Sequence, residues 1–426
     1  MIQGRGPNLL VTLSFLAIIF GVGLVQAVME AQRGQWPQVL SVFDRMPTAK
    51  ALRAYETRLE DSSVAVQRLR PWVQYAQFRF LEDAGDKALA GRDGWMFYRP
   101  SVDYVTRRRT SPPDPGGSAD PLPAIVSFRD ALAARGIRLL IVPAPDKESV
   151  YPDKLTRRTE SLRAFLAPPT QNLLARLREN DVAVVDLFSA FAAAREDARA
   201  ADDPLLYLMQ DSHWSPAGAE MAARLAARTI LDRGWLEPGR TAYAAAPVSL
   251  RRVGDVIRML QVPQIEQWVR PEPVNCRQVV HRTSGETYAD DAGSDVLVLG
   301  DSFLRVYQTD DPGAAGFIAH LARELGRPVA SIVNDGGAAT LVRQDLSRRP
   351  AILAGKKVVI WAFVERDIAF AMEGWQVVPL PTTKPTTNHS VAVSGMSWSS
   401  PRAPLFIKPS RRSRAAPRHS GGRGAC

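Results

Sequence analysis

Short apolar runs that alternate with segments of helical spacing constrain the fold of this chain more than any other feature. Continuous apolar runs of this length are typical of strands buried on both faces, and strands that alternate with helices form parallel sheets. We therefore expect an α/β fold with a doubly wound, mostly parallel five-stranded sheet, whose reactive groups lie at the carboxyl ends of the strands. The expected strands cover residues 137–142, 182–187, 296–299, 329–333 and 357–363.

The segments around these strands divide the chain into further parts. Residues 31–90 carry apolar side chains at helical spacing, which predicts one or two helices. A Gly-rich turn and the aromatic run Trp95–Tyr98 follow, so we expect the folded domain to span residues 91–380. Within it, the stretch 234–294 shows no regular pattern. Residues 381–426 are polar and basic, which predicts a disordered tail.

The formal net charge of +10 does not indicate nucleic-acid binding, because most of it lies in the tail. Residues 381–426 contain eight Lys or Arg and no Asp or Glu, which leaves only +2 of the +10 for residues 1–380. A protein that binds nucleic acid needs a basic stripe on its folded surface. The two cysteines are too few for a zinc site, and no glycine-rich phosphate loop is present. We therefore expect no nucleic acid, no metal and no other cofactor.

The N-terminus predicts export. Residues 9–28 form an uncharged, apolar segment long enough to cross a bilayer as a helix, and the weak charge bias around it keeps the N-terminus in the cytoplasm. We favour an uncleaved signal anchor within residues 1–30. Val25-Gln26-Ala27 also fits a signal-peptidase site, and a buried core helix is a third interpretation. Both export interpretations place the rest of the protein outside the cytoplasm.

A serine motif stands at the end of one expected strand. Gly300-Asp301-Ser302-Phe303 follows residues 296–299 directly, so Ser302 lies where the chain turns from a strand toward a helix. Gly300 permits a tight turn, and the N–H groups of such a turn can point at a developing oxyanion. A serine hydroxyl needs a base to act as a nucleophile near neutral pH. The motif therefore makes Ser302 a candidate nucleophile that requires a histidine.

His213 suits the role of this base best among the five histidines. Asp211 precedes it by two residues in a loop before a helix, so a carboxylate can face the imidazole. The same pattern also suits a helix-capping Asp beside a surface His. Because Ser302 stands at the end of a strand of the same expected sheet, we prefer a triad of Asp211, His213 and Ser302 to the capping interpretation. The other histidines are His281 in the irregular stretch, His320 within a helix, and His389 and His419 in the tail.

Several stretches in order resemble one family. Asp211-Ser212-His213-Trp214 and Gly300-Asp301-Ser302-Phe303 are similar to motifs of the SGNH hydrolase-like alginate O-acetyltransferases of bacterial periplasms. Ordinary SGNH hydrolases carry the serine block first and the Asp/His block last, so this domain resembles a circularly permuted version, as that family has it. Further similar stretches are Gly91–Tyr98, Val142–Lys147, Tyr151–Asp153 and Phe363–Asp367 within residues 45–380.

The resemblance implies an O-acetyltransferase that moves an acetyl group through a serine acyl-enzyme onto hydroxyls of an exported polysaccharide such as alginate. It implies a periplasmic domain held at the inner membrane by residues 9–28, and a membrane-bound O-acyltransferase as acetyl donor. Two alternatives are a polysaccharide acetyl esterase and a non-catalytic, membrane-tethered scaffold or glycan-binding subunit of an exopolysaccharide complex. The reaction product separates the three: a transferase forms acetylated sugar, an esterase forms free acetate, and a scaffold forms neither.

The oxyanion donors do not follow the hydrolase pattern. Where the permuted strand order puts the hydrolase Asn, this chain has Glu365-Arg366. Candidate donors therefore come from turns at the strand ends, where an Asn is also a common turn former. Arg305 and Tyr307, a few residues beyond Ser302, are either contacts for an acidic or hydroxylated sugar or packing residues. The donor candidates are the Ser302 N–H, Gly336, Gly337, Asn334 and Arg366, and the two sugar candidates are Arg305 and Tyr307.

Overall fold

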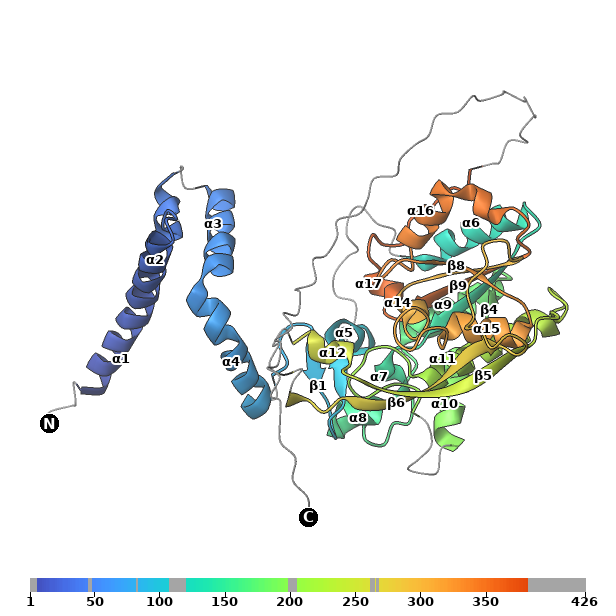
Figure 1. The fold of residues 1–426 in the computed structure, drawn as a ribbon, viewed down its shortest axis with the longest axis horizontal. Coiled ribbons are helices and arrows are strands. Elements are labelled where there is room, and N and C mark those ends of the chain that lie inside the picture. Colours follow the sequence, from blue (N-terminus) through green and yellow to red (C-terminus); the bar gives the residue numbers. More distant parts are fainter. Residues whose placement is uncertain are drawn as a thin grey trace, which may run out of the picture. The chain divides into compact units, whose positions relative to one another are not determined.

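The computed structural model of this chain describes residues 6–44, 48–81, 83–106, 120–197, 205–260, 265 and 268–381. Figure 1 shows the helices and strands of these segments along the chain. The predicted disordered tail, with His389 and His419, lies outside the described residues except for Pro381.

A five-stranded parallel sheet forms the centre of the folded domain (Figure 1). Its strand order is β4-β3-β9-β7-β8, and all neighbouring strands are parallel. Neighbours in space are not neighbours in sequence, so the connections cross over through helices, and the predicted doubly wound α/β fold is confirmed. The strands are β3 (Arg138–Ala144), β4 (Ala183–Val184), β7 (Val296–Gly300), β8 (Ala330–Val333) and β9 (Val358–Val364).

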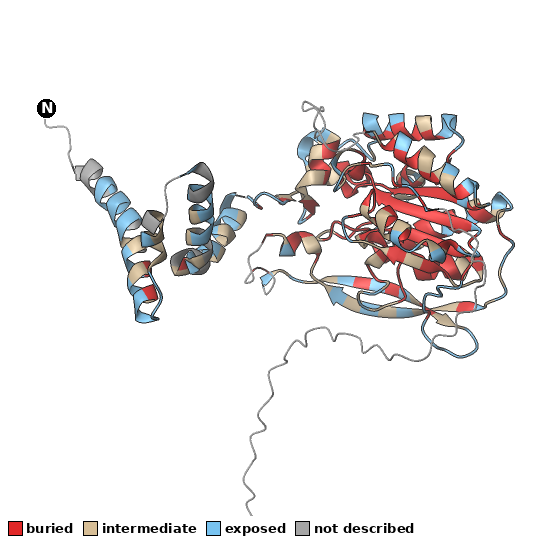
Figure 2. Cartoon of the chain, turned by 90° about the horizontal axis from the view of Figure 1, so that it is seen from above, coloured by how far each residue is buried: buried red, intermediate tan, exposed pale blue. Residues whose placement is uncertain are grey.

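Helices cover both faces of this sheet, because successive side chains of a strand point to opposite faces. Val298 and Ile360 belong to the hydrophobic core on one face, whereas Leu299 and Trp361 belong to the core on the other. Figure 2 shows the strands of the sheet as almost uniformly buried. The first face packs against α10 (Leu187–Asp197), α11 (Pro216–Asp232) and α15 (Phe317–Leu325), and the second against α6 (Pro121–Ala133), α9 (Pro168–Glu179) and α16 (Leu341–Arg348).

The start of the domain and one strand differ from the prediction. The strand β1 (Ala88–Ala90) lies before the expected boundary at residue 91 and pairs with β2 (Met96–Tyr98) in an antiparallel hairpin. The strand β4 is shorter than the apolar run 182–187. It pairs only with β3 through two residues, and α10 begins at Leu187, so the end of that run belongs to a helix.

The stretch 234–294 is not irregular throughout, which corrects the prediction. Two long antiparallel strands, β5 (Tyr243–Arg252) and β6 (Glu272–His281), pair along their full length. Most positions of β5 are partly or fully exposed, so the sequence carries little of the apolar alternation that reveals a half-buried strand. Pro247 and Pro273 within the strands weaken the pattern further.

The N-terminal segment is helical, with one helix long and apolar enough to cross a membrane. This candidate span covers Val11–Gln32 and has a mean hydropathy of 2.3. A signal sequence passes the same test. The segment comprises α1 (Gly6–Leu16), a π-helical turn (Ala17–Gly21) and α2 (Val22–Gln32). Two helices, α3 (Ala49–Ser62) and α4 (Val64–Leu81), follow within residues 31–90, where the sequence predicts one or two.

Short helices complete the described fold, and several begin directly after a strand of the sheet or hairpin. They are α5 (Arg99–Thr106), α7 (Lys147–Val150), α8 (Pro152–Leu155), α12 (Asp255–Arg258), α14 (Ser302–Arg305) and α17 (Asp367–Phe370). Short 3₁₀ helices cover Gln38–Asp44, Arg157–Thr159 and Pro350–Leu353.

Candidate active site

Ser302 is the first residue of α14, immediately after the carboxyl end of β7. Asp301 precedes it as the helix cap, and its Oδ1 accepts a hydrogen bond from the Phe303 N–H at 3.0 Å. A Cβ at position 300 would lie 2.6 Å from a methyl carbon of Leu304 and 3.0 Å from the Ala362 carbonyl oxygen, so a larger residue would force the Leu304 side chain to move. Among the described residues, no acceptor is hydrogen-bonded to the Ser302 N–H. The turn thus presents both a hydroxyl and a free backbone donor.

His213 comes from the loop before α11 and reaches Ser302. Its Nε2 lies 2.8 Å from the Ser302 Oγ, and its Nδ1 lies 2.8 Å from the Asp211 Oδ1. The same carboxylate oxygen accepts the His213 backbone N–H at 3.0 Å. Because an ionised carboxylate only accepts hydrogen bonds, Nδ1 carries the ring proton and Nε2 is left to accept from the serine. The structure therefore brings together the three residues that the sequence singled out.

Trp214 fixes the histidine loop against the serine turn. Its Nε1 donates to the Phe303 carbonyl oxygen at 3.0 Å, and its ring contacts the rings of Phe303 and Phe317. The His213 ring also lies against Phe303, with 4.9 Å between the ring centroids. Trp214 and Phe303, which follow His213 and Ser302 in the sequence, thus contact each other, and this contact sets the distance between the His213 and Ser302 side chains.

The β5–β6 hairpin and α12 hold the other side of Asp211. The Asp211 Oδ2 accepts from the Arg252 Nε at 3.0 Å and from the Asp255 N–H at 3.4 Å. At position 254 a Cβ would lie 2.1 Å from the Gln210 carbonyl group, so only glycine allows this approach. Burial by itself would raise the pKa of Asp211, but its hydrogen bond with His213 and the charges of His213 and Arg252 hold the pKa well below its usual range.

A second carboxylate, Asp255, lies beside the imidazole. Its Oδ2 is 3.4 Å from the His213 Nδ1 and accepts from the Ser212 hydroxyl at 2.6 Å. Burial by itself would lower the pKa of His213, but the Asp255 charge and then Asp211 outweigh it, so the pKa is raised above 6.5. Burial and the charge of Asp211 raise the pKa of Asp255. The two carboxylates thus favour the imidazolium form of His213.

The substitution Asp255→Asn should move the pH dependence of the reaction to lower pH. A general base acts only in its neutral form, so the rate rises with pH as His213 loses its proton. Removing the negative charge that raises the pKa of His213 lowers that pKa. We therefore expect the rising limb of kcat/KM for an acetyl ester to shift to lower pH. Asp232→Asn, an exposed change on α11, is the control, and an equal shift in both variants would contradict this role of Asp255.

Asp211, His213 and Asp255 also form the one described group whose side chains could hold a metal ion, with ligand atoms within 4.8 Å of one another. The inner oxygen of Asp211 and the Nδ1 of His213 already bind each other. The guanidinium of Arg252, packed over the Tyr307 ring, supplies positive charge to the carboxylates. The grouping is accounted for by this network of hydrogen bonds and charges.

Lys147 is a buried lysine that ties three segments together beneath the site. Its Nζ donates to the carbonyl oxygens of Met96, Met209 and Asp211 at 2.6, 2.7 and 3.0 Å. The ammonium also lies over the Trp95 ring at 5.2 Å. Burial lowers the pKa of Lys147 to about 8. The residue belongs to the stretch Val142–Lys147 of the family resemblance, and its contacts position the backbone of the Asp211 loop.

Lys147→Met should destabilise the fold. The methionine fills similar space but leaves three buried carbonyl groups without their donor, so we expect the free energy of unfolding to fall by about 2 to 4 kcal/mol. Urea denaturation of the detergent-solubilised protein measures this change. The control is Lys154→Met, which removes a partly exposed ion pair with Asp93 and should cost less than about 1 kcal/mol. An equal fall in the free energy of unfolding in both variants would show that the buried Lys147 contacts stabilise the fold no more than a partly exposed ion pair does.

Arg366 follows β9 and lies near the turn that carries Ser302. Its Nη1 donates to the Asp146 Oδ1 at 3.0 Å, and its guanidinium lies 5.9 Å from the centre of the Phe303 ring. The neighbouring Glu365 is fully buried, and its carboxylate accepts hydrogen bonds from Ser149 and from the Asp146 N–H. Of the two residues at the position of the hydrolase Asn, Arg366 is therefore the one beside the serine turn.

Of the remaining candidates, Tyr307 is buried, whereas Arg305, Asn334 and Gly336 are at least partly exposed. Tyr307 is fully buried with a left-handed φ of 60°, and Arg252 lies over its ring, so it is a packing residue and not a contact for a sugar. Arg305 is half-exposed and paired with Asp310 and Asp335. The Asn334 amide donates to Asp345 at 2.8 Å. Gly336 has a φ of 70° and, with Gly337, forms the turn after β8.

Sequence reasoning missed the residues, distant in the sequence, whose side chains or backbone bind the Asp211 loop. Arg252 and Asp255 bind Asp211, and the Glu272 carboxylate accepts from the backbone N–H groups of Met209 and Gln210. All three belong to the β5–β6 hairpin or to the helix between its strands. No motif marks them, and only recognition of the hairpin would have placed them beside the loop.

Comparisons with known proteins agree with this fold. Residues 88–365 match the family described as SGNH hydrolase-like domain, acetyltransferase AlgX. The chain is 25% identical over 368 residues to the "Probable alginate O-acetylase AlgJ" of Pseudomonas syringae pv. tomato, which covers 83% of this chain and 87% of that protein. It is 23% identical over 384 residues to the alginate biosynthesis protein AlgX of Pseudomonas aeruginosa, which covers 85% and 70%.

A solved structure shares the fold. The O-acetyltransferase domain of Pseudomonas putida AlgJ aligns with a TM-score of 0.52 and 21% identity, over 66% of this chain and 92% of that domain. The family match itself spans more than half of the chain and includes Asp211, His213 and Ser302. This chain therefore belongs to the family of SGNH hydrolase-like acetyltransferase domains of the AlgX type.

Proposed function

We propose that this protein is a polysaccharide O-acetyltransferase that uses Ser302 as nucleophile, His213 as general base and Asp211 as the carboxylate that orients it. The observation that carries the proposal is a pair of hydrogen bonds, from the His213 Nδ1 to the Asp211 Oδ1 and between the His213 Nε2 and the Ser302 Oγ, each 2.8 Å long. The chain that contains them belongs to an acetyltransferase family. Relatives named alginate O-acetylase support the same reaction type. The acceptor class is an exported polysaccharide.

In the first half-reaction, the Ser302 oxygen attacks the carbonyl carbon of an acetyl donor while the His213 Nε2 takes the hydroxyl proton. The tetrahedral intermediate collapses, the bond to the donor oxygen breaks, and His213 returns the proton to that leaving group. The acetyl group is then esterified to Ser302. Asp211 stays ionised throughout and stabilises the imidazolium, a role that its lowered pKa supports.

In the second half-reaction, a sugar hydroxyl attacks the acetyl-serine. His213 takes the sugar proton, a new ester bond forms at the sugar oxygen, and the Ser302 oxygen leaves with the proton from His213. Water in place of the sugar would give an esterase. The outcome depends on how well the acceptor is held, because a positioned nucleophile outcompetes solvent.

Both half-reactions create an oxyanion, which needs donors. We assign the Ser302 N–H to this role, since it is free of other acceptors in the described structure. The cation of Arg366 beside Phe303 adds electrostatic stabilisation. The turn at Gly336 and Gly337 remains a further candidate, whereas the amide of Asn334 is engaged with Asp345. A single donor in such a hole contributes about 100 to 1000-fold to the rate.

The same proposal includes the location and the acetyl donor. We assign residues 9–28 to an anchor in the inner membrane, residues 31–90 to a helical lead-in and the following domain to the periplasm. Acetyl-coenzyme A has no route to that compartment, so a membrane-bound O-acyltransferase is the proposed donor. The apolar helix Val11–Gln32 supports the anchor.

One assay tests the proposed function. The full-length protein in detergent is incubated with a chromogenic acetyl ester and a polysaccharide oligomer, and the sugar is analysed by mass spectrometry. Acetylated sugar is the expected product. Acetate alone would indicate an esterase, and no turnover with several acetyl donors would favour a scaffold or glycan-binding subunit.

A further inference from the structure

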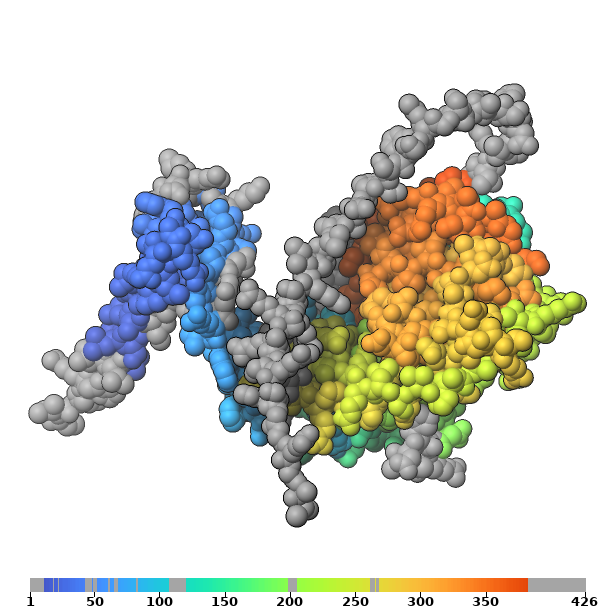
Figure 3. Space-filling view, in the orientation of Figure 1, coloured from blue at the N-terminus to red at the C-terminus, as the bar shows by residue number. Residues whose placement is uncertain are grey.

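The helix α4 carries an apolar stripe that stays exposed. Side chains at positions 69, 72, 73, 76 and 80 follow the spacing of one helical face, because residues three or four apart on a helix lie side by side. The large members of the stripe are 54% to 76% exposed, and they are Leu69, Trp72, Val73 and Phe80. In Figure 3, the mid-blue surface belongs to α3 and α4. Single exposed apolar side chains are normal, but a continuous stripe marks a surface that binds something.

The other side of α4 packs against the folded domain. Tyr75 and Phe78, three residues apart and off the stripe, are partly buried against a hydrophobic cluster that includes Val256 and Ile257 of α12. The Tyr75 ring also meets the Trp268 ring edge-on, with 4.5 Å between the centroids. Packing within the chain therefore uses one side of the helix and leaves the stripe for another contact.

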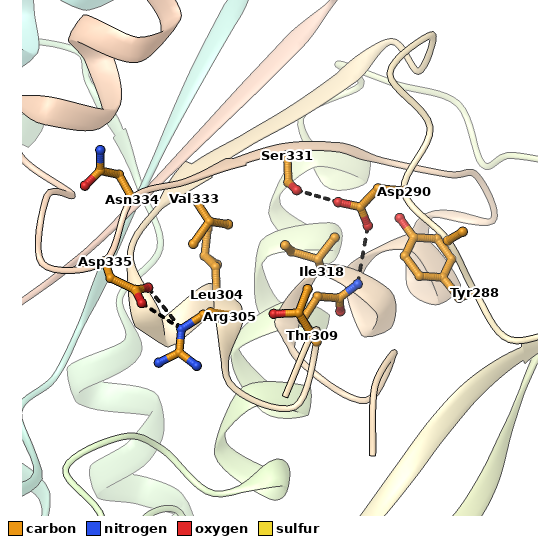
Figure 4. A pocket seen from close by; sticks show the side chains of 12 residues that line it. Tyr288, Asp290, Leu304, Arg305, Thr309, Ile318, Ser331, Val333, Asn334 and Asp335 are labelled. Atoms are coloured by element: carbon orange, nitrogen blue, oxygen red, sulfur yellow. Dashed lines mark hydrogen bonds and ion pairs between the residues drawn. The ribbon is translucent and has the colours of Figure 1, made fainter. Parts of the chain in front are cut away.

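Arginines border the stripe on both sides. With 3.6 residues per turn, Arg68 and Arg79 lie along one edge of the stripe and Arg70 along the other. The helix contains no Asp or Glu, whereas the half-exposed Arg305 of the domain is paired with Asp335 at 2.9 Å (Figure 4). An apolar face with basic edges is typical of a helix that lies in the interface of an anionic bilayer, where arginine side chains reach the headgroups.

The start of α4 lies beside the end of the candidate membrane span. Gln26 is near the C-terminal end of the span Val11–Gln32. Its side-chain amide donates to the Ser62 carbonyl oxygen at 3.0 Å and accepts from the N–H of Val64, the first residue of α4, at 2.9 Å. A span that leaves the bilayer near residue 28 therefore puts the start of α4 at the level of the lipid headgroups.

We infer that α4 lies in the outer surface of the bilayer that the N-terminal span crosses, with its stripe among the lipid chains and its arginines at anionic headgroups. The inference rests on the proposed membrane anchor and adds a second contact with lipid. Because α4 also packs against α12, this contact limits the rotation of the catalytic domain about its anchor.

Fluorescence quenching by lipids tests the position of the stripe. Val73→Cys is introduced into the full-length protein together with Cys426→Ser, labelled with the fluorophore NBD and reconstituted in vesicles of phosphatidylcholine and phosphatidylglycerol. The remaining Cys276 is buried. Nitroxide groups near the headgroup end of the lipid chains should quench the label at least about twofold, since an interfacial helix sinks about 5–10 Å into this region. The control Val377→Cys, a valine of the domain with the same 54% exposure, should not be quenched.

A second stripe position, Leu69→Cys, should give the same quenching as Val73→Cys. Labels at both positions that stay in water, with no quenching, would overturn the inference. Emission that shifts to the blue without quenching would also overturn it, because protein from a partner or a second copy of the chain would then cover the stripe. Equal quenching at positions 73 and 377 would show that the stripe is not the surface that contacts lipid.

Arginine variants test the charge at the edge of the stripe. Arg68→Gln with Arg79→Gln should raise the fraction of phosphatidylglycerol needed for half-maximal quenching at least about twofold, because each basic side chain near an anionic surface favours binding by about fivefold. The control Arg224→Gln with Arg228→Gln removes the same charge from exposed positions of α11 and should leave this fraction unchanged. An unchanged fraction in the α4 variant would contradict the contact with anionic lipid.

The proposed anchor fails separately from this inference. Alkaline carbonate releases proteins that are bound only at a membrane surface, so release of the wild-type protein from the vesicles would contradict both the anchor and the docking of α4. Protein that is retained while the labels on the stripe remain unquenched would contradict the docking of α4 alone. Neither readout depends on acetyl transfer, so the proposed reaction is tested independently.

Discussion

The Ser302→Ala variant is expected to lose acetyl transfer by about 10⁴-fold or more, since no other described side chain lies at hydrogen-bond distance from the His213 Nε2. Without the hydroxyl no acyl-enzyme can form, and only direct attack of the sugar on the donor remains. The side chain is small and starts a four-residue helix, so its loss should leave the fold intact. Initial rates of acetyl transfer to an oligosaccharide measure the effect.

A matched serine gives the control for this loss. Ser249 lies on β5 and its hydroxyl donates to the Asn275 side chain, away from the triad. Ser249→Ala should keep the transfer rate within about twofold, as expected of an exposed substitution. Transfer by Ser302→Ala within tenfold of the wild-type rate would mean that another residue is the nucleophile.

Asp211→Asn should lower the rate by about 10⁴-fold while preserving the shape of the site. An amide in place of the carboxylate presents an N–H to the His213 Nδ1 and so favours the tautomer whose Nε2 carries the proton. That tautomer cannot accept the proton of Ser302. The variant also removes the negative charge that stabilises the imidazolium, and both effects act on the chemical step.

The two carboxylates beside His213 provide an internal comparison for this prediction. Asp211 lies 2.8 Å from Nδ1 and Asp255 lies 3.4 Å from it. Asp255→Asn should therefore reduce the rate by no more than about tenfold while moving its pH dependence. A larger loss for Asp255 than for Asp211 would reverse the assignment. Thermal melts of both variants show whether either loss reflects unfolding.

The strands that the sequence predicts most clearly are those whose burial is complete. Residues 296–300 and 358–364 are buried at every position, so their apolar runs stand out in the sequence. The β5–β6 hairpin could not be predicted in this way, because no position of β5 after Tyr243 is fully buried and the strand contains Pro247. Pairing between two such strands is decided by long-range contacts, which leave little trace in local composition.

The residues of the candidate site also fall into those that the sequence reveals and those that only the folded chain reveals. Asp211, His213 and Ser302 are recognisable because each stands beside a strand or helix end in a short motif, and parallel strands bring such ends to one edge. Arg252 and Lys147 bind the Asp211 loop through contacts that only the folded chain creates. The burial of Tyr307 could not be foreseen either, since it depends on a left-handed turn just past α14.

The most direct test of this account is to locate the acetyl group on the protein. The full-length protein is treated with an acetyl ester without acceptor, quenched in acid, digested and analysed by tandem mass spectrometry. We predict one acetyl group on Ser302 that disappears when an acceptor oligosaccharide is added and that never forms on the His213→Ala variant. Acetylated sugar produced while Ser302 stays unmodified at every time point, or an acetyl group on a different residue that turns over at the same rate, would contradict the account.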